Sequence, residues 1–208
     1  MSKGSRTREM ILERSAPLFN QQGYVGSSLS SIMDATGLEK GGIYNHFESK
    51  EQLALEAFDY TFAKIQQHVQ SLLADKRHAI ERLLALTAAF EGLIEGFPIA
   101  GGCPVLNTAI EADDAHPVLR ERARNAMDQW RGTIRRILTK GIERSEIRPD
   151  VDIEAFTSVM ISLLEGAVML SKLYGDSMHM QRAVAHLRHY IETELQPATL
   201  NNERIGIR

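Results

Sequence analysis

The sequence predicts an all-helical fold. Apolar residues recur at intervals of three and four along nearly the whole chain, which is the period of an amphipathic helix. Strict alternation of apolar and polar residues does not persist over four or more positions, so no strand is predicted. Glycine, serine and aspartate separate the helical segments at places that fit about nine helices.

Composition excludes several classes of protein. The chain has 208 residues, of which 43% are hydrophobic and 25% are charged, a balance typical of a soluble globular protein. Its formal net charge of −3 argues against indiscriminate coating of nucleic acid, so any contact with DNA must be local. A local basic bias exists at the start, where Lys3, Arg6 and Arg8 precede the first acidic residue.

We expect a cytoplasmic protein that has no contact with a membrane. No uninterrupted apolar run approaches the roughly 18 residues of a membrane helix, and the first residues lead into an amphipathic pattern. The single cysteine, Cys103, cannot form an internal disulfide, which fits a reducing compartment. No motif indicates a cofactor or a metal site, and we predict neither.

The N-terminal part of the chain predicts three helices, the last two of them short. The apolar spacing and the caps place them over residues 6–22, 28–36 and 40–47. Gly23 and Gly37 follow the first two as C-terminal stops. Three such helices with a tight turn before the last are typical of a helix-turn-helix, whose final helix lies in the major groove of DNA.

The rest of the chain predicts a larger helical body. A long connecting helix begins after the N-cap Ser49 and continues to about Asp75. Further helices follow from apolar spacing, caps and breaks. They are expected over residues 78–96, near 107–111, and over 117–141, 153–174 and 179–196.

The helix over 153–174 is apolar on nearly all sides and therefore needs cover on two faces. Small residues interrupt its apolar run and permit close approach of another helix. We expect it to form a four-helix dimer interface together with the helix over 179–196. A two-fold dimer would address half-sites about 34–36 Å apart, so its operator should be approximately palindromic.

The third helix displays side chains suited to a DNA duplex. Lys40, Tyr44, Asn45 and His46 supply a cation, a phenol, an amide and an imidazole. The segments 28–32 (SLSSI), 36–47 (TGLEKGGIYNHF) and 49–53 (SKEQL) carry a close resemblance to the TetR (TetR/AcrR) family of transcriptional regulators, which covers roughly residues 6–55.

The resemblance implies roles for individual residues. It assigns Lys40, Gly42 and Asn45 to the groove-facing side of the third helix, and the other polar residues to phosphate contacts. Because Gly42 stands where many members carry a small hydroxyl residue, we expect base reading to depend more on Lys40 and Asn45. The predicted DNA contacts are Ser28, Lys40, Gly41, Gly42, Tyr44, Asn45, His46 and Lys50.

The resemblance also implies a function and a domain organisation. We expect a repressor that a small-molecule effector releases from DNA, with a DNA-binding domain over 1–50, an effector-binding and dimerisation domain over 51–197 and a flexible tail over 198–208. Apolar spacing and polar placement suggest effector contacts, although the apolar members could equally be core. These residues are Phe62, Phe90, Cys103, Asn107, Glu111, Met127 and Trp130.

Three alternatives stand beside this interpretation. An architectural nucleic-acid binder with no effector is disfavoured by the acidic net charge and by a C-terminal part too large for dimerisation alone. The other two depend on Cys103. Cys103 precedes a predicted helix and could sense an electrophile or oxidant if the helix N-terminus stabilised its thiolate, although a lone cysteine is more often a buried apolar residue. An enzyme using this cysteine would need a base, for which only His116 stands near in sequence, so we predict no enzyme. Asp113, Asp114 and His116 fit a solvated turn better than a metal site.

Overall fold

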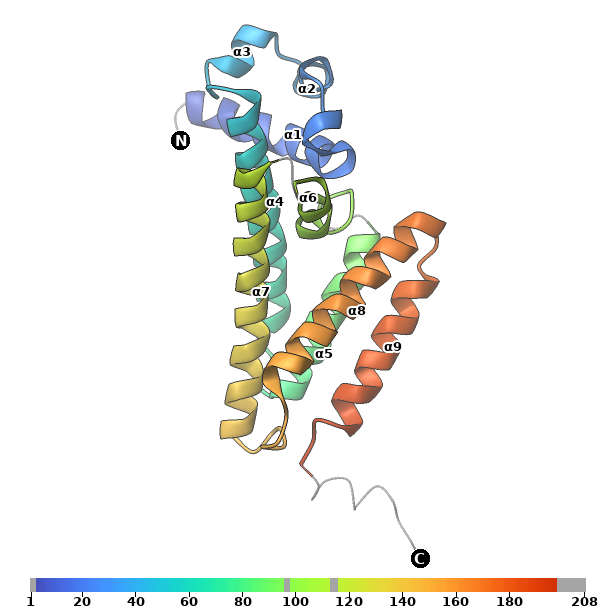
Figure 1. Ribbon diagram of the computed structural model, residues 1–208. Coiled ribbons are helices and arrows are strands. Elements are labelled where there is room, and N and C mark those ends of the chain that lie inside the picture. Colours follow the sequence, from blue (N-terminus) through green and yellow to red (C-terminus); the bar gives the residue numbers. More distant parts are fainter. Residues whose placement is uncertain (1–2, 96–97, 113–115, 198–208) are drawn as a thin grey trace, which may run out of the picture. The chain divides into compact units, whose positions relative to one another are not determined.

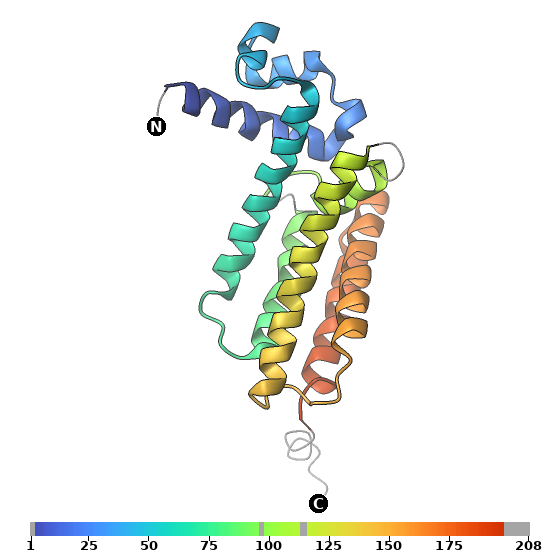
Figure 2. The same cartoon turned by 60° about the vertical axis from the view of Figure 1, so that its left-hand side comes forward.

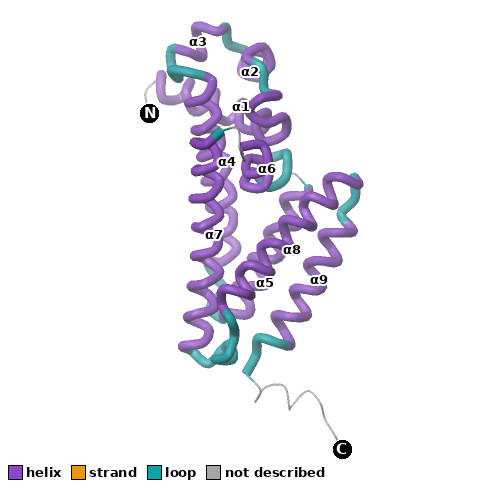
Figure 3. Tube along the Cα trace, viewed as in Figure 1, coloured by secondary structure: helices purple, strands orange, loops and turns teal. Residues whose placement is uncertain are grey.

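The computed structural model describes residues 3–95, 98–112 and 116–197. Across these described ranges the regular structure consists of α-helices without a strand, which confirms the predicted fold class (Figures 1 and 3). The predicted tail over 198–208 lies outside them. The helices are α1 (Lys3–Gly26), α2 (Leu29–Thr36), α3 (Lys40–Tyr44), α4 (Lys50–Leu73), α5 (Ala79–Ile94), α6 (Pro104–Ala112), α7 (Pro117–Glu143), α8 (Ile153–Tyr174) and α9 (Met178–Thr193).

The observed helices follow the predicted ones closely, with two local differences. Helix α1 does not stop at Gly23 but kinks there, at φ 74° and ψ 176°, and continues to Gly26. Helix α3 is shorter than the predicted 40–47. The residues after Tyr44 form a tighter turn, in which the N–H of His46 donates to the Ile43 carbonyl three residues earlier and not to the carbonyl four residues earlier.

The chain folds into two compact units, each assembled from two stretches of sequence. The head unit comprises residues 1–67 and 96–127, and the body unit comprises 68–95 and 128–208. Helices α4 and α7 therefore contribute to both units. The predicted boundary at residue 50 separates a DNA-binding part from an effector-binding part. It is a division by function and not by compact unit, and it stays a prediction.

A small apolar core holds the head unit together. It joins α1, α2, α3 and the start of α4 through five side chains with at most 1% of their surface exposed. These are Ile11, Ile32, Ile43, Phe47 and Leu53. Ile43 and Phe47, four residues apart, both face this core. The core therefore fixes which side of α3 faces outward.

The body unit is a packed group of helices in which α5, α8 and α9 contact one another. In two views α8 and α9 run side by side in opposite directions (Figures 1 and 2). Their buried side chains include Leu83 from α5, Met160 and Val168 from α8, and Ile191 from α9. Leu138 adds the second half of α7 to the same unit.

Helix α8 buries one face and leaves the other open. Met160, Leu164 and Val168 are buried, whereas Val159 is 62% and Leu173 71% exposed. By length and composition α8 could span a membrane, yet 44% of its most apolar stretch is buried against other helices. The predicted need for a second cover therefore remains on the open face.

We expect Leu138→Ala to lower the free energy of unfolding by about 2–5 kcal/mol, because it removes a fully buried side chain and leaves a cavity. Urea unfolding followed by circular dichroism measures the change. Val118→Ala in the same helix, where the side chain is 47% exposed, serves as the control and should change little. Equal losses in both variants would contradict the placement of Leu138 in the core.

Candidate nucleic-acid interface

The turn between α2 and α3 sets the outward face of α3. Gly37 adopts the left-handed conformation at φ 69°, and its N–H donates to the Met33 carbonyl over 2.8 Å, which ends α2. The chain then re-enters a helix at Lys40, with Ile43 turned into the core. The tight turn between two short helices matches the helix-turn-helix predicted from the sequence.

The predicted polar side chains lie on α3 and on the two residues that follow it, Asn45 as its C-cap and His46 in the next turn. Lys40 and Asn45 are exposed, and Tyr44 and His46 are half-buried. The ammonium of Lys40 lies 5.9 Å from the centroid of the Tyr44 ring. A side chain at Gly41 would meet no atom within 4 Å, so this stretch of backbone is open to close approach by a duplex.

Ser28 caps the start of α2 and remains exposed. Its hydroxyl oxygen accepts from the N–H of Ser31 over 3.0 Å. The first N–H groups of α2 and the positive end of its dipole therefore lie beside an exposed hydroxyl, an arrangement that suits a phosphate.

Lys50 begins α4 and is half-buried. Its ammonium lies 4.5 Å from the centroid of the Tyr24 ring, a residue that sequence reasoning had not singled out. The same ring meets the His116 imidazole edge-on, with centroids 4.9 Å apart and an interplanar angle of 76°. Nε2 of His116 is also 3.5 Å from a carboxylate oxygen of Glu51.

Helix α6 holds the end of α1 through hydrogen bonds. The carboxylate of Glu111 accepts from the N–H groups of Tyr24, at 2.8 Å, and Val25, at 2.9 Å. The amide of Asn107 donates to the backbone oxygen and the side-chain oxygen of Asn20, at 2.9 and 3.0 Å. Two residues predicted as effector contacts are thus engaged with the DNA-binding helices in this structure.

The loop before α6 also contacts α1, and together these contacts form the junction between α6 and the end of α1. The buried amide of Asn20 donates to the carbonyls of Ala100, at 2.9 Å, and Gly102, at 3.1 Å. Gly101 has φ 112°, and a Cβ there would lie 2.9 Å from the Asn20 backbone oxygen. Both the backbone angle and the close approach therefore require glycine at position 101.

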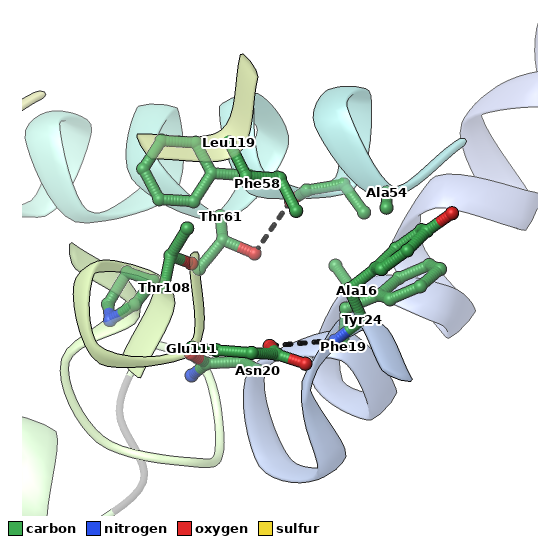
Figure 4. A pocket seen from close by; sticks show the side chains of 12 residues that line it. Ala16, Phe19, Asn20, Tyr24, Ala54, Phe58, Thr61, Thr108, Glu111 and Leu119 are labelled. Carbon is green, nitrogen blue, oxygen red and sulfur yellow. Dashed lines mark hydrogen bonds between the residues drawn. The ribbon is translucent and has the colours of Figure 1, made fainter. Parts of the chain in front are cut away.

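A pocket of about 370 Å³, counting space open to solvent, lies beside this junction within the head unit (Figure 4). Phe58 and Thr61 of α4 line one side, and Thr108 and Glu111 of α6 line another. The hydroxyl of Thr61 is engaged with the Ala57 carbonyl over 2.9 Å. The pocket is mixed in character, with apolar walls and a few polar atoms.

Ion pairs tie α4 to its neighbours inside the head unit. Arg8 of α1 pairs with Glu56, and its guanidinium lies 4.7 Å from the Phe47 ring centroid. Arg122 of α7 pairs with Asp59 over 2.8 Å. Partial burial raises the pKa of the Asp59 carboxyl, and the nearby Arg122 charge only partly opposes that increase.

Cys103 is fully buried at the start of α6, and its sulfur accepts from the N–H of Leu106 over 3.3 Å. The expected position at a helix N-terminus is therefore observed. Reactive cysteines need access to their reagents, however, and this thiol has no exposed surface. The redox alternative consequently gains no support.

The other predicted effector residues are divided between the units. Phe62 and Met127 belong to the head unit, the former buried and the latter half-buried. Phe90 and Trp130 belong to the body unit, where their rings meet edge-on with centroids 5.5 Å apart. Among the described residues no cluster of three or more metal-ligating side chains occurs, and Asp113 and Asp114 lie outside that part of the chain.

Comparisons with known proteins agree with this geometry. The family model "Bacterial regulatory proteins, tetR family" matches residues 11–57, and "Tetracyclin repressor-like, C-terminal domain" matches residues 79–187. The transcriptional regulator LmrA of Bacillus subtilis is 32% identical, over 82% of this chain and 88% of LmrA. The repressor DhaR of a Mycobacterium species is 28% identical, over 80% and 82% of the two chains.

Solved structures show the same fold. A TetR transcriptional regulator from Chloroflexus aurantiacus superposes with a TM-score of 0.91 at 47% identity, over 95% of this chain and all of the other. A TetR-family regulator from Cytophaga hutchinsonii gives a TM-score of 0.87 at 36% identity, over 94% and 98%.

The helix-turn-helix, its exposed polar face and the helical body define a DNA-binding transcriptional regulator. The matches to both domains and to LmrA show that the chain belongs to the TetR family.

Glu111→Ala should lower the free energy of unfolding by about 1–2 kcal/mol, because it leaves two backbone N–H groups of α1 without their acceptor. Urea unfolding provides the measurement. The matched control is Ile110→Ala, one residue earlier in α6, where the side chain is 66% exposed. If both variants keep the parent stability, the bonds to α1 contribute nothing.

Proposed function

We propose that this regulator is a repressor that binds a palindromic operator as a homodimer and leaves it when a small molecule binds. The observation that carries the proposal is the outward face of α3. Its polar side chains are open while Ile43 and Phe47 anchor the opposite side in the core. A helix anchored in this way can enter the major groove without losing its own support.

Within this proposal the DNA contacts divide into two kinds. Lys40 and Asn45 are exposed on α3 and read bases, the lysine at guanine and the amide at adenine, each contact worth about 1–3 kcal/mol of discrimination. The remaining contacts fix position on the phosphates. They come from Ser28, Gly41, Tyr44, His46 and Lys50, whereas Gly42 faces the groove without a side chain.

The dimer forms through α8 and α9. The open face of α8 carries large apolar side chains, Val159, Met169 and Leu173, and Met178 at the start of α9 is also exposed. Small residues between them, among them Ser158 and Ser162, allow a second helix to approach closely. A second copy presenting the same strip completes a four-helix interface, which is the self-complementary contact of a two-fold dimer.

Effector binding acts by changing how the DNA-binding helices are held. In the head unit Asn107 and Glu111 of α6 form hydrogen bonds with α1. An effector that favours another position of α6 weakens these bonds. The effector shifts the equilibrium only by its different affinity for the two states. A regulator from Saccharomonospora viridis, which shares the fold at 24% identity, was solved in complex with choline. This fold can thus hold a small organic molecule.

Selection of bound sequences from a random duplex pool tests the function. The purified protein should enrich an approximate palindrome with half-sites about one helical turn apart. Tyr44→Ala, which removes a proposed phosphate anchor, should enrich far less. A folded dimer that enriches no sequence would contradict the proposal.

Lys40→Ala should relax sequence preference at one position of each half-site, because it removes a base contact worth about 1–3 kcal/mol. Affinities for the selected operator and for single-base variants give the measurement. Lys3→Ala, on the exposed first turn of α1, is the comparison and should leave the preference unchanged. A uniform loss across all sequences in Lys40→Ala would make the residue a phosphate contact instead.

Val159→Arg should shift the protein toward monomer, because it places a charge in the centre of the proposed apolar interface. Sedimentation velocity over a dilution series reports the dimer fraction. Thr139→Arg adds the same charge on an exposed position of α7 and should leave the dimer intact. An unchanged dimer in Val159→Arg would exclude this face of α8 as the interface.

A further inference from the structure

Tyr24 stands where three helices of the head unit meet the start of the DNA-binding surface. Its backbone N–H donates to Glu111 of α6, as the dashed line in Figure 4 marks, over 2.8 Å. Its ring lies beneath the ammonium of Lys50, 4.5 Å from the nitrogen, and meets the edge of His116 at the start of α7. The backbone and the ring of one residue therefore contact three separate helices.

The break in α1 explains why α6 controls this residue. After Gly23 the chain starts a new turn, which the N–H of Ser27 closes on the Gly23 carbonyl over 3.1 Å. The N–H groups of Tyr24 and Val25 thus form the N-terminus of that turn, and the carboxylate of Glu111 caps them from another helix. A Cβ at Gly23 would collide with this carboxylate, so the cap also requires the glycine.

The ring restrains a flexible cation. A lysine ammonium is a point charge on a four-carbon stem, and ordering that stem opposes phosphate binding. Attraction between the cation and the face of Tyr24 places the Lys50 ammonium before DNA arrives. The carboxylate of Glu51, the next residue, lies 3.5 Å from Nε2 of His116, whose ring also contacts Tyr24.

We propose that Tyr24 is a positioning residue, which presets Lys50 for a DNA phosphate and is itself held in place by Glu111 of α6. The inference rests on the proposed function, in which Lys50 contacts the backbone of the duplex. Tyr24 acts through the lysine and touches no base. A displacement of α6 then moves the lysine as well as the end of α1.

The test compares Tyr24→Leu, Tyr24→Phe, Lys50→Ala and the double variant Tyr24→Leu/Lys50→Ala in the full-length protein. Affinity for the selected palindrome, or for a mixed-sequence duplex if selection enriches none, is measured by fluorescence anisotropy at several KCl concentrations. Val25→Ala, at a neighbouring side chain that is 79% exposed, is the matched control.

Tyr24→Leu should weaken binding about two- to fivefold, the equivalent of one exposed cation–π contact, and Tyr24→Phe should restore the parent affinity. Lys50→Ala should reduce the slope of log K against log [KCl] by about one. The double variant should bind no more weakly than Lys50→Ala, since Tyr24 acts through that lysine.

The outcomes distinguish a failure of the positioning role of Tyr24 from a failure of the proposed operator binding. Additive losses in the double variant, with the lysine effect present, overturn only the positioning role. An unchanged affinity and salt slope in Lys50→Ala remove the phosphate contact and the positioning role together, while an enriched palindrome would still support operator binding.

A measurement on the parent protein guards against misfolding of Tyr24→Leu. The ε-methylene protons of Lys50 should resonate upfield of ordinary lysine values in the DNA-free protein, because the ammonium to which they are adjacent lies over the Tyr24 ring. Tyr24→Phe should keep this shift. Ordinary chemical shifts in the parent protein would overturn the inference without any variant.

Discussion

The hydrogen bonds between α6 and the broken end of α1 connect the helices around the small apolar core to the rest of the head unit. Breaking α1 at Gly23 leaves two backbone N–H groups that need an acceptor, and the Glu111 carboxylate supplies it. The amide of Asn107 donates two further bonds to oxygens of Asn20, about one turn away. Through these groups a helix distant in sequence determines where the DNA-binding helices lie.

Two restraints of different kinds act on the DNA-binding helices. The apolar core around Phe47 fixes α3 relative to α1 and α2, and that core has no need of α6. The bonds to α6 add a second, polar restraint, whose strength depends on geometry. In the proposed mechanism the effector acts on this polar restraint, by its different affinity for two positions of α6.

Helix α8 keeps large apolar side chains exposed after the body unit has packed. Its apolar residues exceed what one chain can cover, since Val159 and Leu173 stay exposed after the body unit has packed. Their apolarity was visible in the sequence as a helix without a polar face. Which residues turn inward was not visible, because a helix that is apolar on all sides gives no periodic signal to orient it.

The sequence by itself determined the helical fold, the helix-turn-helix and the polar display on α3, because periodicity, caps and turn residues are local properties. It also placed Cys103 at the start of α6. Only the tertiary structure decided what Asn107 and Glu111 do, and that Tyr24 meets Lys50. The partners of Asn107 and Glu111 in α1 lie 86 or 87 residues earlier in the chain. No local pattern specifies such a pairing, because it depends on how the packed helices bring distant side chains together.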